Sequence, residues 1–148
     1  FFFTAIGLQL LFSGFAWWLV ILGFITMICS GGFIMAIVFQ IAHVVEGVEQ
    51  PLPTSEGKIE NEWVIHQLMT TSNFSRNNSV LSWFVGGLNF QIEHHLFPNI
   101  CHIHYKKISY IVERVAREYG LPYNMQASFV GAIASHTRML KNLGRKVA

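Results

Sequence analysis

The chain has 148 residues, of which 52% are hydrophobic, and its formal net charge is +2. That charge is too small to indicate a nucleic-acid partner, and the two cysteines, Cys29 and Cys101, suggest no disulfide framework. Residues 1–45 contain no Asp, Glu, Lys or Arg, so all eight acidic and all ten basic residues come later. So long an uncharged stretch predicts a membrane segment followed by a water-facing segment, and it is about three times too long for the apolar core of a signal peptide.

The uncharged stretch predicts two transmembrane segments joined by a tight connection. A spanning helix needs about 20 apolar residues, so we expect residues 1–12 to be the end of a span that begins upstream of this chain. Residues 13–16 form the connection, and a second span is expected from about 17 to 44. Because every Lys and Arg follows this span, its C-terminal end is predicted to face the cytoplasm. The lipid bilayer is therefore an expected partner of the chain.

The water-facing residues 46–148 are expected to form a cytoplasmic helical domain. A turn-rich linker at 51–57 is followed by a short helix at 62–70. Ser79 is a suitable N-cap for an apolar helix that ends near Pro98. The predicted fold is thus an all-α membrane protein, which consists of the last transmembrane hairpin, with its first span truncated, and a cytoplasmic helical cap.

Two amphipathic helices are predicted to close the chain. The first ends at Gly120 and Pro122 and is supported by a Glu113–Arg117 pair at i,i+4 spacing. Its expected apolar face consists of Ile108, Ile111, Val112, Val115 and Tyr119. The second is expected to stop at Gly144, and its apolar face consists of Phe129, Val130, Ile133, Leu140 and Leu143.

The two adjacent histidines of the chain lie in the run from Gln91 to His95, with sequence QIEHH. At 100° per residue, Gln91, His94 and His95 share an arc of about 100° on a helix, whereas Glu93 points to the far side. Two imidazoles and an amide that face one point are a candidate metal site. Neutral imidazole suits Zn, Cu, Fe and Ni, so these residues alone do not name the metal. A pair of surface histidines is the alternative interpretation.

His43 is the second candidate because of its depth in the membrane. If Trp17 marks one interface, about 20 residues of helix reach the other near Ile37, and His43 lies about 9 Å further along. An ionisable residue at the mouth of a span is a functional candidate, although a histidine that reaches into the headgroups is the simpler alternative.

The other histidines indicate lesser roles. His102 and His104 are two residues apart and do not share a helix face, so with Cys101 they offer too few ligands for a zinc site. His66 is expected on a short helix where it could orient a ligand. We expect His136, on the last amphipathic helix, to be solvated.

Residues 91–98, QIEHHLFP, resemble the third histidine box of membrane fatty-acid desaturases, and the initial Gln is typical of the front-end group. Residues 39–46 (FQIAHVVE), 63–68 (WVIHQL), 99–105 (NICHIHY) and 120–124 (GLPYN) are similar to bacterial members described as linoleoyl-CoA desaturase-like. The resemblance covers essentially the whole chain.

This resemblance implies a di-iron, O2-dependent fatty-acyl desaturase that introduces a double bond into a lipid- or CoA-linked acyl chain. His94 and His95 match ligand positions of the third box, and His43 matches the ligand near the cytoplasmic end of the fourth span. Gln91 stands where other branches place a third-box histidine. The two other histidine boxes are expected upstream, so the chain would supply part of a site for two Fe ions and would be inactive alone.

The resemblance also implies a separate electron donor of ferredoxin or cytochrome b5 type and a multi-pass protein of the bacterial inner membrane. Two alternatives stay open. A related di-iron hydroxylase or ketolase would use the same histidine chemistry, and a non-catalytic membrane metal-binding module would bind the metal without turnover.

Overall fold

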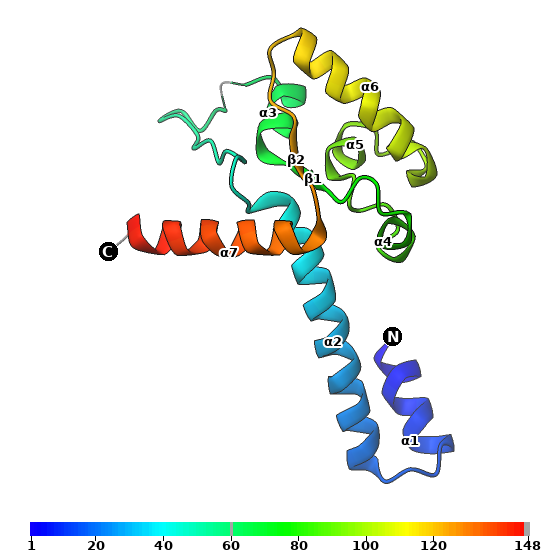
Figure 1. Ribbon diagram of the computed structural model, residues 1–148. Helices are drawn as coiled ribbons and strands as arrows, with labels where there is room; N and C mark the ends of the chain where they lie inside the picture. Colours follow the sequence, from blue (N-terminus) through cyan, green and yellow to red (C-terminus); the bar gives the residue numbers. More distant parts are fainter. Residues whose placement is uncertain (60, 147–148) are drawn as a thin grey trace. The chain divides into compact units, whose positions relative to one another are not determined.

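The uncharged N-terminal stretch is helical and folds back on itself. The computed structural model describes residues 1–59 and 61–146, and the chain divides into two compact units, Phe1–Ile37 and Val38–Ala148. In the first unit, the π-helix η1 (Phe3–Gly7) continues into α1 (Leu8–Phe12), and a turn leads into α2 (Trp17–His43). Figure 1 shows α1 beside the N-terminal part of α2.

The turn and the aromatic contacts explain this reversal. Gly14 has φ +69°, a left-handed conformation that glycine adopts without steric cost. The rings of Phe1 and Phe2 then pack against Phe24 of α2, with centroid distances of 6.1 Å and 5.9 Å. A tight connection at 13–16 was expected from the sequence.

Helix α2 agrees with the span expected at about 17–44. Among the described residues, it is the one helix that is long and apolar enough to cross a membrane by length and composition. The two hydroxyl groups of α2 form hydrogen bonds with backbone carbonyls of the same helix. Thr26 donates to the carbonyl of Leu22, and Ser30 donates to that of Thr26. Side chains of α2 are buried only in its last turns, at Val38, Ile41 and Ala42, which belong to the second unit.

The second unit consists of short helices around a small sheet. In chain order its further elements are α3 (Trp63–Thr70), β1 (Ser72–Phe74), α4 (Ser79–Phe84), α5 (Gln91–Leu96), η2 (His102–His104), α6 (Tyr105–Glu118), β2 (Asn124–Gln126) and α7 (Phe129–Lys146). Helix α5 lies at the centre, in contact with α3, α6 and β1. The core joins these elements through Leu68, Ile92 and Ala116, with Val112 and Leu121 packed against them.

The prediction of an all-α fold was wrong in one detail, because β1 and β2 form a parallel two-stranded sheet. Ser72 pairs with Asn124, and the register continues to Phe74 and Gln126. The polar side chain of Asn124 strengthens this contact by donating to the carbonyls of Leu68 and Thr71. The chain is otherwise mostly helical, as expected.

The apolar helix predicted from Ser79 to near Pro98 was also wrong, because the structure has two short helices there. Helix α4 begins after Asn78, whose side chain accepts a hydrogen bond from the backbone N–H of Leu81, so Asn78 is the N-cap. The chain then turns at Gly86 and Gly87, both at positive φ, before α5 begins. A Cβ at Gly87 would lie 2.7 Å from the His102 side chain, so this turn needs glycine for space as well as conformation.

Helices α6 and α7 form where the periodicity predicted them, but they bury only part of the faces expected: Val112 packs against the core and the Phe129 ring lies against Phe74. Helix α6 buries Tyr105, Ser109 and Ala116 and leaves Ile111 53% exposed. Val115 and Tyr119 of the expected face are exposed as well. The Glu113–Arg117 pair is present at 2.6 Å.

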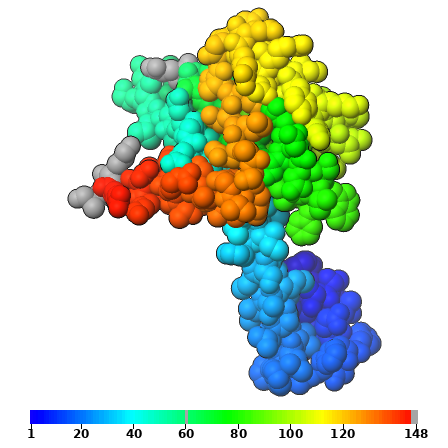
Figure 2. All heavy atoms as spheres, in the orientation of Figure 1, coloured from blue at the N-terminus to red at the C-terminus, as the bar shows by residue number. Residues whose placement is uncertain are grey.

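Helix α7 likewise buries its small residues, Ala132 and Ser135, and exposes Val130 and Leu140. It does not stop at Gly144 but continues to Lys146. Figure 2 shows its orange and red atoms against the cyan atoms of the segment that follows α2. Small side chains allow α7 to approach that backbone closely.

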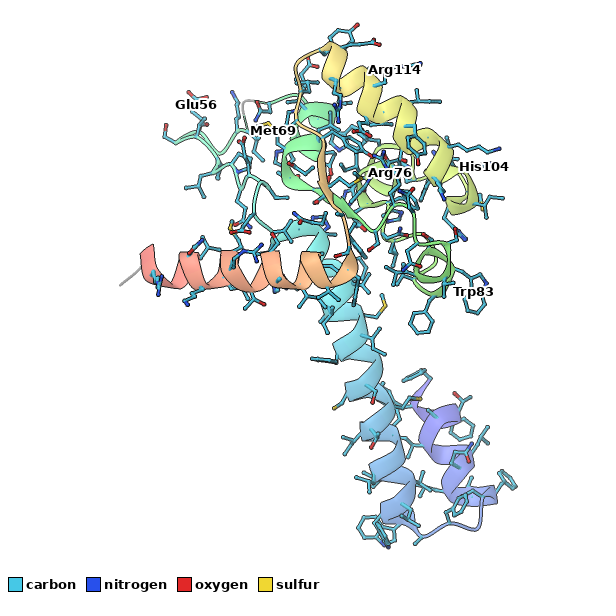
Figure 3. All side chains as sticks on the ribbon, in the orientation of Figure 1. Glu56, Met69, Arg76, Trp83, His104 and Arg114 are labelled. Carbon is cyan, nitrogen blue, oxygen red and sulfur yellow. The ribbon has the colours of Figure 1, made fainter. Side chains whose placement is uncertain are left out.

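Arg76 is the charged side chain on which the packing of α6 depends. Its side chain is 6% exposed and lies inside the second unit, whereas Trp83 points outward (Figure 3). The guanidinium lies over the rings of Tyr110 and Tyr123, 4.7 Å and 5.3 Å from their centroids, and bonds Glu113 at 2.5 Å. This hydrogen bond lowers the pKa of Glu113 below its ordinary value of 4.5 and keeps the carboxylate ionised.

We therefore predict that Arg76→Gln lowers the free energy of unfolding by about 2–4 kcal/mol, because the ion pair of a buried guanidinium with the partly buried Glu113 carboxylate and two aromatic contacts are lost. The matched control is Arg117→Gln, which removes the exposed arginine from the same Glu113 carboxylate and should cost less than about 1 kcal/mol. Denaturant unfolding of both variants in detergent measures the difference. Equal losses in the two variants would contradict the role of Arg76.

Candidate metal site

The candidate site lies where α5 meets the end of α2. Gln91 and His95 are one helical turn apart on the same face of α5, and their Nε2 atoms are 3.1 Å apart. The Nε2 atom of His43 is 3.4 Å from that of Gln91, and the rings of His43 and His95 meet edge to face with centroids 5.3 Å apart. Three of the four predicted ligand side chains therefore converge, and all three belong to the second unit.

His94 is beside this group but does not complete it. Its ring is 5.7 Å from that of His95, perpendicular to it, and 6.4 Å from the ring of Tyr105. Within residues 1–59 and 61–146, no three His, Cys, Asp or Glu side chains lie close enough together to hold a metal ion. The 100° between neighbouring helix positions separates the directions of His94 and His95. The ligand role of His94 stays a prediction.

The backbone at the end of α3 orients the ring of His43. The Nδ1 atom of His43 is 3.4 Å from the carbonyl oxygen of Thr70, the last residue of α3. Carbonyls in the last turn of a helix have no partner within the helix, so this oxygen is free to accept. With Nδ1 as the donor, the lone pair of the imidazole lies on Nε2, which faces Gln91. A histidine held in this way is ready to bind a metal.

Gln91 has an amide oxygen without a partner. The side chain is 2% exposed, and its Oε1 atom is buried with no hydrogen-bond partner among the described residues. A buried polar atom without a partner costs about 1–3 kcal/mol. Rotation of the amide would exchange Oε1 and Nε2 and direct the oxygen to the two imidazoles. Two imidazole nitrogens and one amide oxygen then form a donor set that suits a divalent transition metal.

The pKa of His95 shows that the site favours neutral imidazole. Burial, followed by the nearby rings of His43 and His94, lowers the pKa of His95 to about 4. At neutral pH the ring is therefore uncharged, which is the state that binds a metal ion. Partial burial of the His95 ring therefore favours the protonation state that a metal ligand needs.

Helix α7 holds the backbone that follows His43. The Nδ1 atom of His136 is 2.7 Å from the carbonyl oxygen of Val44, and Ser135 accepts from the backbone N–H of Glu46 at 3.0 Å. Arg138 binds the Glu46 carboxylate at 2.8 Å. The expectation that His136 is merely solvated was wrong, because its ring is half-buried against this segment.

The remaining histidines lie apart from the converging group. His66 is on α3, as expected, and its buried Nδ1 atom has no hydrogen-bond partner in the described part of the chain. His102 and His104 form the exposed turn η2, beside the exposed Cys101. These positions favour polar surface roles for His102 and His104.

Sequence reasoning missed the residues on the far side of α5. Glu93 points away from the histidines, as predicted, but it is fully buried and bonded to Asn73 and Tyr123. A buried acidic side chain needs partners. The hint in the sequence was a glutamate, next to Ile92, in a helix that was expected to be apolar.

Comparisons with known proteins point to one family. The sequence profile of the family described as fatty acid desaturase matches residues 1–127. The chain is 40% identical over 153 residues to an sn-1 linoleoyl-lipid 6-desaturase of Synechocystis sp., in an alignment that covers 96% of this chain and 43% of the relative. No solved structure matches.

Two further relatives have similar names. An sn-1 linoleoyl-lipid 6-desaturase of Arthrospira platensis is 45% identical over 112 residues, which are 76% of this chain and 30% of the relative. An acyl-lipid (8-3)-desaturase of Physcomitrium patens is 42% identical over 113 residues, 76% of this chain and 23% of the relative. The chain thus spans less than half the length of these relatives.

We predict that His43→Ala and His95→Ala each weaken the binding of Co2+, used as an absorbing probe ion, by about 10–100-fold or more, because each removes a converging nitrogen. Visible absorption titrations of the protein expressed from its complete gene measure this. His104→Ala, the same change on an exposed turn, is the control and should leave the affinity unchanged. A loss as large in the control as in the other two would show that Co2+ binds elsewhere.

Proposed function

We propose a function from one premise: this chain belongs to the fatty acid desaturase family. The complete protein is proposed to be a front-end fatty-acyl desaturase that uses O2 and iron to introduce a double bond into an acyl chain. The observation that carries the proposal is the convergence of His43, from the end of an apolar helix, with Gln91 and His95 in a partly buried site.

The residues of the site fit iron. Two neutral imidazoles and an amide oxygen are ligands that Fe2+ accepts, and His94 is adjacent to them. When bound, iron would supply the oxidation of an unactivated C–H bond, which amino-acid side chains cannot perform. Three or four side chains are too few for two ions, so the proposed pair of Fe ions requires further ligands from other parts of the complete protein.

The chain's own residues have three tasks in this proposal. The Thr70 carbonyl holds the His43 ring in the tautomer with a free Nε2. Burial keeps His95 uncharged and limits the access of water to the site. The partly buried ring of His94, against Tyr105, closes the side of the group that faces α6.

The reaction balances with an external reductant. A saturated –CH2–CH2– unit loses two hydrogens, O2 takes up these two hydrogens with two further electrons and two protons, and two waters leave. The two electrons need a separate donor protein, for which we propose a ferredoxin or cytochrome b5 type. The names of the relatives, which are linoleoyl-lipid and acyl-lipid desaturases, support a lipid-linked chain over a CoA-linked one.

We propose that α2 crosses the membrane with its C-terminal end in the cytoplasm. Its 27 residues extend about 40 Å, enough for a hydrocarbon core of about 30 Å, and the basic residues all follow it. The preceding helical segment would be the end of another span of a multi-pass protein. In this proposal the site lies at the cytoplasmic surface of the membrane, which we propose to be a bacterial inner membrane.

The two natural cysteines test this topology. Cys101 is exposed on the second unit and Cys29 is exposed on the apolar helix, where lipid would cover it. We predict that a membrane-impermeant maleimide labels Cys101 in inside-out vesicles and not in intact cells, and that Cys29 stays unlabelled in both. Cys101→Ser identifies the labelled site. Labelling of Cys101 in intact cells would reverse the proposed orientation.

Lipid analysis tests the activity. Expression of the complete gene in a host without polyunsaturated lipids, supplied with linoleate, should give fatty acids with one additional double bond. We predict that His95→Ala lowers product formation at least about 100-fold, because a ligand is lost, while His104→Ala retains it. Hydroxylated or keto products would favour the related oxygenase, and unchanged lipids despite bound iron would favour a non-catalytic metal-binding module.

A further inference from the structure

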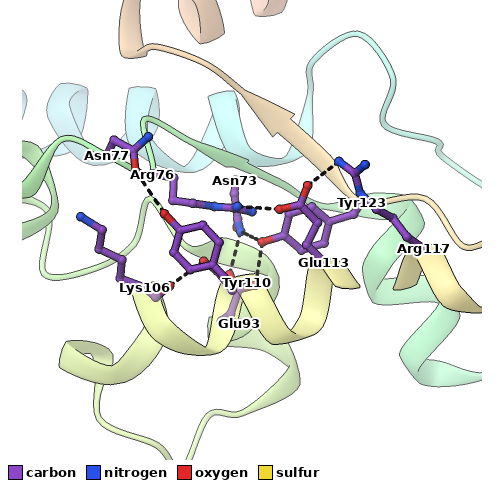
Figure 4. Close-up of polar contacts among 10 residues, drawn as sticks. Asn73, Arg76, Asn77, Glu93, Lys106, Tyr110, Glu113, Arg117 and Tyr123 are labelled. Carbon is purple, nitrogen blue, oxygen red and sulfur yellow. Dashed lines mark hydrogen bonds and ion pairs between the residues drawn. The ribbon is translucent and has the colours of Figure 1, made fainter. Parts of the chain in front are cut away.

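We propose that Asn73, Glu93 and Tyr123 are positioning residues, which fix the rotation of α5 about its axis and thereby direct its ligand side chains to the site. The inference rests on the proposed function only for its consequence for metal binding. Its structural part concerns a closed set of hydrogen bonds on the face of α5 opposite the histidines (Figure 4).

Asn73 binds α5 at two points. Its Oδ1 atom accepts from the backbone N–H of Ile92 at 2.9 Å, and its Nδ2 atom donates to Glu93 Oε2 at 2.7 Å. The N–H groups in the first turn of a helix have no partner within the helix, so Asn73 supplies one from a distant part of the chain. Asn73 itself is fully buried and held in β1 by its pairing with Met125 of β2.

Tyr123 closes the set. Its hydroxyl donates to Glu93 Oε1 at 2.9 Å and accepts from Asn73 Nδ2 at 2.7 Å. Burial, together with the nearby Glu93 carboxylate, raises the pKa of Tyr123 well above its ordinary value of 10.0, so the hydroxyl keeps the proton that it donates. The Arg76 guanidinium against the Tyr123 ring holds this side chain in turn. Both Glu93 oxygens therefore have fixed partners on one side of α5.

The geometry of a helix connects these bonds to the site. Glu93 is two residues from both Gln91 and His95, so at 100° per residue it points about 200° away from them, to the opposite face. A rotation of α5 that broke the bonds of Glu93 would turn Gln91 and His95 away from His43. The fully buried Ile92 resists large rotations, and the hydrogen bonds of Glu93 add the defined direction that an apolar contact lacks.

An exchange of donor and acceptor tests the proposal. Asn73→Asp still offers an oxygen to the Ile92 N–H, but it places a carboxylate against the Glu93 carboxylate. Combining it with Glu93→Gln returns an amide to the pair, now on α5, so that the hydrogen bond re-forms in the opposite direction. Glu93→Gln alone keeps an oxygen for the Asn73 amide and should have a small effect.

Two readouts apply to the protein expressed from its complete gene: hydrogen–deuterium exchange of the peptide that covers residues 91–96, and Co2+ affinity. We expect Asn73→Asp to accelerate exchange and to weaken Co2+ binding about 10–100-fold. If Asn73→Asp weakens Co2+ binding about 100-fold, the double variant should bind Co2+ at least about tenfold more tightly than Asn73→Asp. This is the size of coupling found between residues in contact. Asn77→Asp, the same change at an exposed position, is the matched control and should leave both readouts unchanged.

The outcomes separate the alternatives. If the double variant is no better than Asn73→Asp in either readout, or if Asn73→Asp exchanges and binds as the wild type does, the proposal is wrong. If Asn73→Asp does not fold, Tyr123→Phe, which removes only a hydroxyl, should accelerate exchange at 91–96, and unchanged exchange there overturns the proposal.

Failure of the proposed function looks different from failure of this inference. If the wild type binds no Co2+ and forms no product, the function is wrong, while the exchange of residues 91–96 still reports whether α5 is held by these bonds. Normal product formation together with unchanged exchange in Asn73→Asp would instead leave the function intact and remove the positioning role.

Discussion

A helix of six residues cannot hold its own shape, and this limit governs the site. Forming the first turn of a helix costs more than its few hydrogen bonds return, so short helices depend on tertiary contacts. Helix α5 has such contacts on three sides, from α3, α6 and β1. The buried Ile92 fixes its depth in the core, and the bonds of Glu93 fix its rotation. In our proposal, the direction of the candidate ligand side chains is thus decided by residues that are not themselves ligands.

The other half of the site is stabilised by different elements but in a similar way. His43 ends a helix whose earlier residues have few contacts in the chain, so the backbone after it must be fixed from outside. The C-terminal end of α3 contacts its ring, and α7 binds Val44 through His136 and Glu46 through Ser135 and Arg138. Segments that are about 90 residues apart in the sequence therefore meet next to His43.

Much of the helical structure could be predicted from the sequence, because its causes are local. The uncharged stretch predicted a helix at about 17–44, and the periodicity after residue 104 predicted the two amphipathic helices. The failures have causes that periodicity does not contain. Gly86 and Gly87 end an apolar helix at positive φ, and β1 pairs with a strand about 50 residues later.

The buried faces of α6 and α7 were harder to predict than the helices. Both helices bury small or polar residues, such as Ser109 and Ser135, and leave Ile111 and Leu140 exposed. A serine can be buried when its hydroxyl is bonded, as Ser109 is to the Lys106 carbonyl and Ser135 is to Glu46. Sequence patterns that place apolar residues inside therefore assign these faces only in part, because close backbone approach also matters here.

The position of the site along the chain has a physical consequence for the proposed chemistry. His43 lies near the end of the uncharged stretch, three residues before the first charged residue, Glu46. An acyl chain is stable only on the apolar side of that boundary, and electrons and protons arrive only from the polar side. A metal site between them must be dry enough to keep His95 neutral, yet it must hold polar ligands in fixed directions. Polar bonds placed behind α5, rather than at the site itself, meet both requirements, because they orient the ligands without adding charge beside them.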